Sequence, residues 1–374
     1  MSDGVLAPEA GLALRHRQRE ALPSRNPCPA TVGFVRNAWY VVAYSHEVGR
    51  AELLCRRCCD EPLVLYRTEH GDAVALYDRC PHRGVPLSHG KIVGNSIQCS
   101  YHGFQFASDG RCGVVPTQEQ IPRQMCVKTY PLIEKAHFIW IWMGDPAKAD
   151  ESLLPDHYAL GLDRPGWTAA PYFMLEIKAN YSMLFENLLD TSHISFLHGS
   201  ALDSGRMAQA SFRIEHDERS VRLIRDLKGD MPNPSNAGQY GLQPGVMFDR
   251  ELTSLAYLPN LHVIRNTFTF PSEPGHAPHI RINVMPITPV STNRLYQFLT
   301  LTTSYPEQHP SSLIEAMRKV FGQDTVALEA IQQYYDDLGE DLPECSVKAD
   351  GAALMARRNL ASMSSAETPS LSRD

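Results

Sequence analysis

Four side chains that bind transition metals stand in two short arms of this sequence. Cys80 and His82 form the first arm, within CPHRG, and Cys99 and His102 form the second, within CSYHGF. Zinc accepts two thiolates and two imidazoles, so a structural zinc site is one interpretation. The short spacing within each arm favours another, in which two facing loops hold a two-iron, two-sulfide cluster with the cysteines on one iron and the histidines on the other. Imidazole ligands raise the potential of such a cluster, which suits an acceptor of electrons.

Glycines flank both arms. Gly84, Gly90 and Gly103 supply the permissive backbone that tight loops around a cluster need. Ligands and glycines together favour the cluster over zinc. The segment resembles the Rieske domain of the Rieske non-heme iron oxygenases, with Phe104 where many members carry Trp.

A second group of candidate ligands follows in the pattern D-x-x-H-x-x-x-x-H. We expect a helix over residues 181–197, which would place Asp190 and His193 on one face and let His198 swing back from the helix end. Two imidazoles can share one iron, and a mononuclear iron that activates dioxygen needs two histidines and one carboxylate on one face. Alone, the pattern is also typical of capping and surface residues. Together with the cluster motif it predicts a mononuclear iron site.

The resemblance covers nearly the whole chain after residue 33, and it implies roles that the spacing leaves open. It implies Asp324, in VFGQDTVALEAIQ, as the third iron ligand beside His193 and His198. It also implies that Asp190 bridges an iron histidine to the cluster histidine of a neighbouring subunit. Asn187, one helical turn before Asp190, is expected near the same pocket without binding metal. We assign Asp190 and Asn187 as catalytic positions.

Further segments narrow the resemblance to the vanillate and dicamba O-demethylase branch. They are DGRCGVVPTQEQIP, FIWIWMGDP and a terminal helix with Asp350, Ala353 and Arg357-Arg358. The resemblance implies a homotrimeric terminal oxygenase with one [2Fe-2S] cluster and one mononuclear Fe(II) per chain. Electrons would come ultimately from NAD(P)H through a ferredoxin, a flavin-containing reductase or both. The implied reaction is O2-dependent O- or N-dealkylation of a small aromatic compound, such as a methoxybenzoate, an aryl amine or an anilide herbicide.

Three other functions stay open. The same metal pair could hydroxylate an aromatic ring or side chain, including dihydroxylation. The chain could be an electron-transfer Rieske protein without oxygenase activity, or a zinc-stabilised binding module. An active mononuclear site would distinguish an oxygenase from the electron-transfer protein and from the zinc-stabilised module. A red-brown colour would exclude the zinc-stabilised module, which should be colourless.

Sequence alone leaves the substrate open. A carboxylated substrate needs a buried cation or several polar donors in the pocket. Candidates are His262, Arg265, Asn266 and Arg281, although each is also typical of a solvated strand residue or a structural donor. If none of them faces the iron, a neutral substrate is the better expectation.

Composition excludes several classes of protein. The 374 residues carry 35 basic and 42 acidic side chains, with a formal charge of -7 and no block of like charges, so nucleic acid is not an expected partner. The longest apolar run, residues 138–143, is too short to cross a membrane. Nine cysteines in a long chain disfavour a disulfide framework. Residues 1–27 lack the pattern of a signal peptide, which predicts a cytoplasmic protein.

The hydrophobic pattern predicts an α+β protein in four parts. Residues 1–33 are expected to be a mobile tail, and 34–150 an all-β Rieske domain of many short strands. Residues 151–362 are expected to form a helix-grip catalytic domain, an antiparallel sheet with covering helices that holds the mononuclear iron. Residues 363–374 are expected to be a frayed C-terminus.

Overall fold

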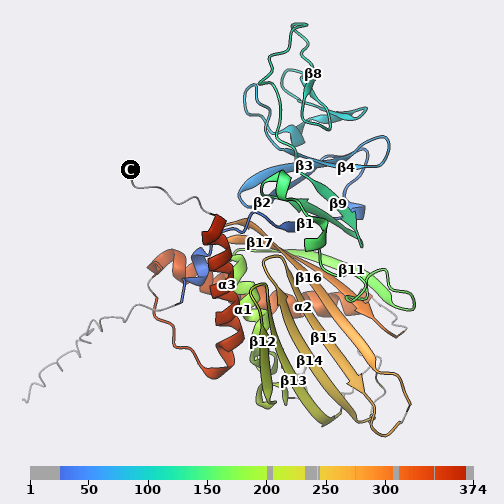
Figure 1. Ribbon diagram of the computed structural model, residues 1–374, viewed down its shortest axis with the longest axis vertical. Coiled ribbons are helices and arrows are strands. Elements are labelled where there is room, and N and C mark those ends of the chain that lie inside the picture. The colour runs from blue at the N-terminus through green and yellow to red at the C-terminus, as the bar shows by residue number, and fades with distance from the viewer. Residues whose placement is uncertain are drawn as a thin grey trace, which may run out of the picture.

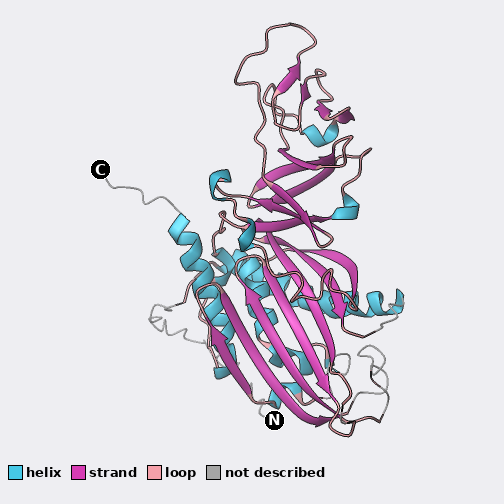
Figure 2. Ribbon diagram, turned by 45° about the vertical axis from the view of Figure 1, so that its right-hand side comes forward, coloured by secondary structure: helices cyan, strands magenta, loops and turns pink. Residues whose placement is uncertain are grey.

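The computed structural model describes residues 26–199, 205–231, 242, 245–273, 275–305, 311–340 and 342–367. Small sheets occupy one end of the long axis, and a large sheet covered by helices occupies the other (Figures 1 and 2). All strand pairs within these sheets are antiparallel. The predicted α+β class, with an N-terminal β part and a C-terminal helix-covered sheet, is confirmed.

The N-terminal part contains three small sheets. The first has the order β1 (Trp39–Tyr44), β10 (Phe138–Trp142), β9 (Leu132–Lys135); the second β2 (Leu54–Cys58), β3 (Glu61–Arg67), β4 (Ala73–Tyr77); the third β5 (Lys91–Val93), β6 (Ser96–Gln98), β7 (Gln105–Phe106), β8 (Cys112–Val114). The third sheet carries the two predicted metal-binding arms in the loops around it, and it forms the protruding end of the molecule (Figure 1).

The C-terminal part is one sheet of seven strands. Its order is β11 (Thr168–Ile177), β17 (Arg294–Thr303), β16 (His279–Ser291), β15 (Leu261–Thr269), β14 (Phe248–Tyr257), β13 (Ser220–Asp230), β12 (Phe212–His216). The helices α1 (Tyr181–Leu189), α2 (Ser311–Leu338) and α3 (Gly351–Glu367) lie together on one face of this sheet (Figure 2). Alternate strand residues contribute to the apolar core beneath the helices. No helix in the described ranges is long and apolar enough to cross a bilayer.

The opposite face of the large sheet packs against β1, β9 and β10. Trp39, Val41 and Trp140 share one buried cluster with Val263 and Val284 of the large sheet. The N-terminal part is therefore fastened to the face of the sheet that the helices leave open.

The helix expected over residues 181–197 is shorter than predicted. It begins after Asn180, whose side chain accepts a hydrogen bond from Ser182 N, and it ends at Leu189. Asp190 leaves the helical conformation at φ -88° and ψ 87°, and its carboxylate caps a separate 3-10 turn over residues 191–195. The prediction was wrong because the short polar side chain of Asp190 accepts from the local backbone N–H of Ser192 and so competes with the helix.

Both ends of the chain are more ordered than expected where the structure describes them. Residues 1–25 and 368–374 lie outside the described residues. Ala30 and Val32, within the expected tail, are buried in the core beneath the helices. Helix α3 continues past residue 363, and Glu367 accepts hydrogen bonds from the backbone N–H groups of Arg36 and Asn37. The entering chain is thus tied to the last helix.

Tyr44 provides the first prediction, because its buried hydroxyl joins the two parts. The hydroxyl lies 2.8 Å from Leu299 O and 3.0 Å from Phe173 O, and it accepts from Leu299 N at 3.0 Å. Tyr44→Phe removes these hydrogen bonds from a buried site, so we expect the free energy of unfolding in urea to fall by about 1–2 kcal/mol. Tyr158→Phe is the control, since Tyr158 is 56% exposed and its variant should unfold like the parent protein. Equal stability of both variants would contradict the role given to Tyr44.

Candidate metal centres

The two arms at the protruding end fold into matching loops. Gly84 N–H donates to Cys80 O at 2.9 Å, and Gly103 N–H donates to Cys99 O at 3.1 Å. Both glycines have positive φ, 80° and 73°, which residues with a side chain rarely adopt. Gly90 serves the fold differently: its φ is -89°, but a Cβ there would lie 2.1 Å from a carbonyl oxygen of β6. The sequence thus predicts correctly that the loops need glycine at these three positions. It does not show that Gly90 is needed for lack of space rather than for its backbone conformation.

The four side chains on these loops match the demands of a [2Fe-2S] cluster. The Cys80 and Cys99 sulfurs are buried, whereas His82 is half-buried and His102 exposed. The two imidazole rings lie 4.6 Å apart, and Phe104 stacks on His82 at 4.8 Å. Burial raises the pKa of the Cys80 thiol, so a cation is needed to hold a thiolate there. A cluster with its cysteine iron inside and its histidine iron toward solvent fits this arrangement.

None of the other seven cysteines, all of which the structure describes, belongs to a group of three or more potential metal ligands. All nine are free, so the structure contains no disulfide among them. Cys58 and Cys59 are buried in the apolar core of the N-terminal part.

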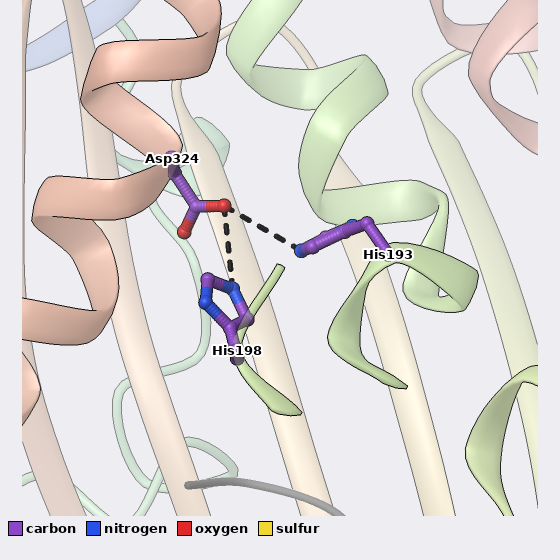
Figure 3. A group of neighbouring side chains, drawn as sticks. All are labelled: His193, His198 and Asp324. Carbon is purple, nitrogen blue, oxygen red and sulfur yellow. Dashed lines mark ion pairs between the residues drawn. The ribbon is translucent and has the colours of Figure 1, made fainter. Parts of the chain in front are cut away.

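The second centre lies between the helices and the large sheet. His193 comes from the 3-10 turn after α1, His198 from the following turn, and Asp324 from the middle of α2 (Figure 3). Asp324 Oδ1 lies 3.5 Å from His193 Nε2 and 3.3 Å from His198 Nε2. Ligand atoms of the three residues lie within 4.8 Å of one another. Asp324 is 2% exposed, so its carboxylate faces the histidines away from bulk water.

Hydrogen bonds fix both imidazoles for metal binding. His193 Nδ1 donates to the backbone oxygen of Asp190, and His198 Nδ1 donates to Gln323 Oε1 at 3.0 Å. Both partners can only accept, so each ring carries its proton on Nδ1 and directs the Nε2 lone pair inward. Two lone pairs and a carboxylate then converge on one point, where a cation removes their repulsion. Two imidazoles and one carboxylate on one side are the donor set of non-heme Fe(II).

The pKa values of the two histidines move in opposite directions. Burial lowers the pKa of His193, and the neighbouring His198 adds to this, against the attraction of Asp324. Burial also opposes protonation of His198, but the hydrogen bonds that its ring donates to Asp324 and Gln323, and the negative charge of Asp324, outweigh burial and raise the pKa of His198. The carboxylate therefore acts most strongly on His198.

Asn187 and Asp190 support the triad from the outer side. Asn187 Nδ2 donates to Asp324 Oδ1 at 3.3 Å. Asp190 Oδ1 accepts from Ser192 N at 2.9 Å and from Ser192 Oγ at 2.6 Å, which fixes the turn that carries His193. Both residues line a depression of the outer surface that ends at His193. The expectation that Asp190 and His193 share one face of a helix was wrong, because α1 ends at Leu189. The two residues are joined instead by the hydrogen bond from His193 Nδ1 to the Asp190 carbonyl group.

A cavity opens on the inner side of the triad, toward the sheet. Its lining consists of the triad, the apolar residues Leu188, Ile194, Leu252, Ile264, Met317, Val320 and Phe321, and the polar residues Thr191, Arg250, Asn266, Arg281 and Asn283. Of the four candidates from the sequence, Asn266 and Arg281 line the cavity. Arg265 alternates to the other face of β15, and His262 is buried against Ser254 at 2.8 Å. No feature of the sequence marked Arg250 or Asn283 as residues of the cavity. Gln323, which accepts from His198, was marked only by its place next to Asp324.

Two donor sets of these types in one chain, the second beside a cavity, are the arrangement of the Rieske-type non-heme iron oxygenases. Comparison with known proteins agrees. Residues 38–131 match the Rieske [2Fe-2S] domain, and residues 177–366 match the vanillate O-demethylase oxygenase C-terminal domain. The chain therefore belongs to the vanillate O-demethylase oxygenase family of Rieske oxygenases.

Individual relatives show the same relationship. The chain is 40% identical over 184 residues to the iron-sulfur subunit of the toluene-4-sulfonate monooxygenase system of Comamonas testosteroni, covering 49% of this chain and 52% of that protein. It is 30% identical over 318 residues to the vanillate O-demethylase oxygenase subunit of a Pseudomonas species, covering 80% and 86%. The match thus spans about half the length of the former relative and most of the latter.

Solved structures share the fold. Dicamba monooxygenase bound to 3,6-dichlorosalicylic acid superposes with a TM-score of 0.81 at 25% identity, covering 90% of this chain and 99% of that one. Another structure of dicamba monooxygenase, with non-heme iron, superposes with a TM-score of 0.77. The predicted cofactors, a [2Fe-2S] cluster and a mononuclear iron, are confirmed for this family.

Removal of the Asp324 carboxylate should empty the second centre alone. We expect Asp324→Ala to lower the iron content by about one ion per chain and to abolish oxygen-dependent turnover, because two imidazoles bind Fe(II) weakly. The visible spectrum of the cluster should not change. Glu329→Gln is the matched control: it removes a carboxylate of the same helix that accepts from Lys178 N. Unchanged iron content in Asp324→Ala would exclude this triad.

Proposed function

We propose that the chain is the terminal oxygenase component of a multicomponent monooxygenase that removes an alkyl group from a small aromatic ether, amine or anilide. The observation that carries this proposal is the donor triad His193, His198 and Asp324 on the wall of a largely apolar cavity, in a chain that also holds a Rieske cluster. An electron-transfer protein needs the cluster but has no use for the triad or the cavity. Relatives named as O-demethylase and N-alkylformylase oxygenase components support dealkylation.

The proposed chemistry requires little acid–base catalysis from the protein. When bound, the mononuclear iron supplies O2-derived oxidation of a C–H bond next to an ether oxygen or amide nitrogen. Insertion of one oxygen atom gives a hemiacetal or hemiaminal, which collapses to an aldehyde and the dealkylated arene. The second oxygen atom leaves as water with two electrons and two protons. The apolar wall, formed by residues such as Leu252 and Phe321, positions the ring and excludes water.

The oxygenase must receive electrons at the cluster and use them at the triad. The cluster loops lie around the third small sheet at the protruding end of the molecule (Figure 1), whereas the triad comes from α2 and the turns that follow α1. We therefore propose a homotrimer in which the cluster end of one copy reaches the triad of the next. The depression lined by Asn187, Asp190 and His193 gives access to the triad from outside. Ile331 and Tyr334 expose apolar surface on α2, the helix that carries Asp324. A ferredoxin or a flavin-containing reductase, supplied by NAD(P)H, would reduce the cluster.

Product analysis tests the reaction. Iron-loaded protein, reduced without oxygen and then exposed to it, should convert a panel of methoxybenzoates, N-alkyl anilides and N-methyl arylamines. We expect aldehyde and dealkylated arene in equal amounts, with no product from Asp324→Ala. A diol or a retained hydroxyl group as the main product would replace dealkylation by hydroxylation.

Mixed oligomers test electron transfer between copies. Asp324→Ala keeps the cluster and lacks the iron ligand, whereas His102→Ala keeps the triad and lacks a cluster ligand. Each variant alone should be inactive. Dissociated and reassembled together in equal amounts, they should recover roughly a quarter of the parental turnover, because half of the triads are intact and half of these face an intact cluster. No recovery, with mixed oligomers shown by mass spectrometry, would favour transfer within one chain.

A further inference from the structure

We propose that three buried side chains of the large sheet, Arg225, Ser254 and His262, are positioning residues for the second metal centre. They hold the backbone on both sides of Asp190 and so fix where His193 lies. None of the three is among the described residues that line the cavity beside the triad. The inference rests on the proposed role of His193 as an iron ligand, but it does not depend on which reaction the oxygenase performs.

The three side chains lie on the face of the sheet that the helices cover. Ser254 of β14 pairs with Leu223 of β13, and Arg225 is two residues beyond Leu223, so both point to one face. His262 of β15 pairs with Ala256, two residues beyond Ser254, and shares that face. Leu223 and Ala256 belong to the apolar core beneath the helices. The three polar side chains are therefore buried between the sheet and the helix layer.

Ser254 and His262 hold the last turn of α1. The last carbonyl groups of a helix have no donor within it, so a buried one needs a partner elsewhere. Ser254 Oγ donates to Leu188 O at 2.7 Å. A hydroxyl has one proton, so Ser254 Oγ accepts at its 2.8 Å contact with His262 Nε2. Burial lowers the pKa of His262 to about 3, which keeps the ring neutral and gives it one donor nitrogen. The donors thus run in one direction, from His262 through Ser254 to Leu188 O.

Arg225 holds the turn that carries His193. Its Nε donates to Thr191 Oγ1 at 2.7 Å, and its Nη1 donates to the carbonyl oxygens of Met207 and Ala210 at 3.1 and 2.7 Å. Arg225 and Thr191 are each 1% exposed. A guanidinium group is planar and presents its donors in fixed directions. Arg225 therefore ties the turn after Asp190 to strand β13 and to the chain that enters the sheet.

The two contacts restrain the backbone between them. Leu188 and Thr191 lie on either side of Asp190, whose carbonyl oxygen accepts from His193 Nδ1. A shift at either contact turns this carbonyl group and the imidazole ring bonded to it. A metal binds only the chains whose ring is in place, so its affinity falls with the fraction of such chains. The sheet residues are therefore expected to contribute to iron affinity as well as to stability.

Removal of one buried hydroxyl tests the inference. Fe(II) would be titrated without oxygen into full-length protein that retains its cluster. We expect Ser254→Ala to raise the Fe(II) dissociation constant roughly 3- to 10-fold, because the loss of one hydrogen bond lowers the competent fraction. Ser254→Thr keeps the hydroxyl and should restore the affinity.

Thr288→Val is the matched control for Ser254→Ala. The buried Thr288 hydroxyl, on the face of the sheet away from the helices, donates to Val41 O at 2.6 Å. Both variants remove one buried hydroxyl that donates to a backbone carbonyl group. We expect a similar fall in the free energy of unfolding in urea, but unchanged iron affinity in Thr288→Val.

The second contact is tested at both of its ends. Arg225→Met should weaken Fe(II) binding roughly 10- to 100-fold, the effect of losing a group that orients a metal ligand. If this variant does not fold, Thr191→Val removes the acceptor of Arg225 Nε and should weaken binding in the same direction.

The geometry of the iron gives a readout that is independent of affinity. The electron paramagnetic resonance spectrum of Fe(II) with nitric oxide, recorded with the cluster oxidised, reports the arrangement of the ligands. We expect a changed spectrum in Ser254→Ala and Arg225→Met and the parental spectrum in Thr288→Val.

Each outcome supports or overturns the inference. Equal iron affinity and equal spectra of Ser254→Ala and Thr288→Val would overturn it, as would a loss of affinity that Ser254→Thr does not restore. Iron retained by Asp324→Ala would overturn it together with the triad, so failure of the ligand assignment is distinguished from failure of the two contacts. The expected pattern supports the inference whichever products the oxygenase forms.

Discussion

The second metal centre depends on the point at which the chain leaves the helix at Asp190. An α-helix continued through residue 197 would rotate His193 and His198 onto different sides of its axis. Instead, Asp190 ends α1 and its carboxylate caps the next turn through Ser192. The carbonyl group freed at this break accepts from His193 Nδ1. One local departure from the helix therefore both positions the first imidazole and selects its tautomer.

Much of the N-terminal part could be predicted from the sequence because its chemistry is local. Each cluster arm places two donors and a glycine within a few residues, so spacing alone limits the loop. The mononuclear centre is different, since Asp324 comes from a helix far along the chain and only resemblance to a family pointed to it. Gln323 could not be assigned a role because its effect depends on where α2 crosses His198.

The sheet residues of the cavity show the same limit. Alternation along β15 separates Asn266 from Arg265, but a sequence does not say which of two polar neighbours faces the iron. That choice follows from the strand order and from the face that the helices cover. In the folded protein Asn266 and Arg281 line the cavity, whereas His262 makes a buried contact with Ser254. The predicted length of the first helix was wrong for a related reason. The helical pattern over 181–197 does not show that Asp190, inside it, caps a new turn.

The lining of the cavity comes from two layers of the protein, the helices and the sheet. The donor triad and the groups that orient it come from α1, α2 and the turn between them. The polar residues Arg250, Asn266 and Arg281 of its lining come from three central strands, each hydrogen-bonded on both sides. The residues that form the triad and these polar residues of the lining are thus on different elements, in a family whose members carry names of chemically diverse substrates.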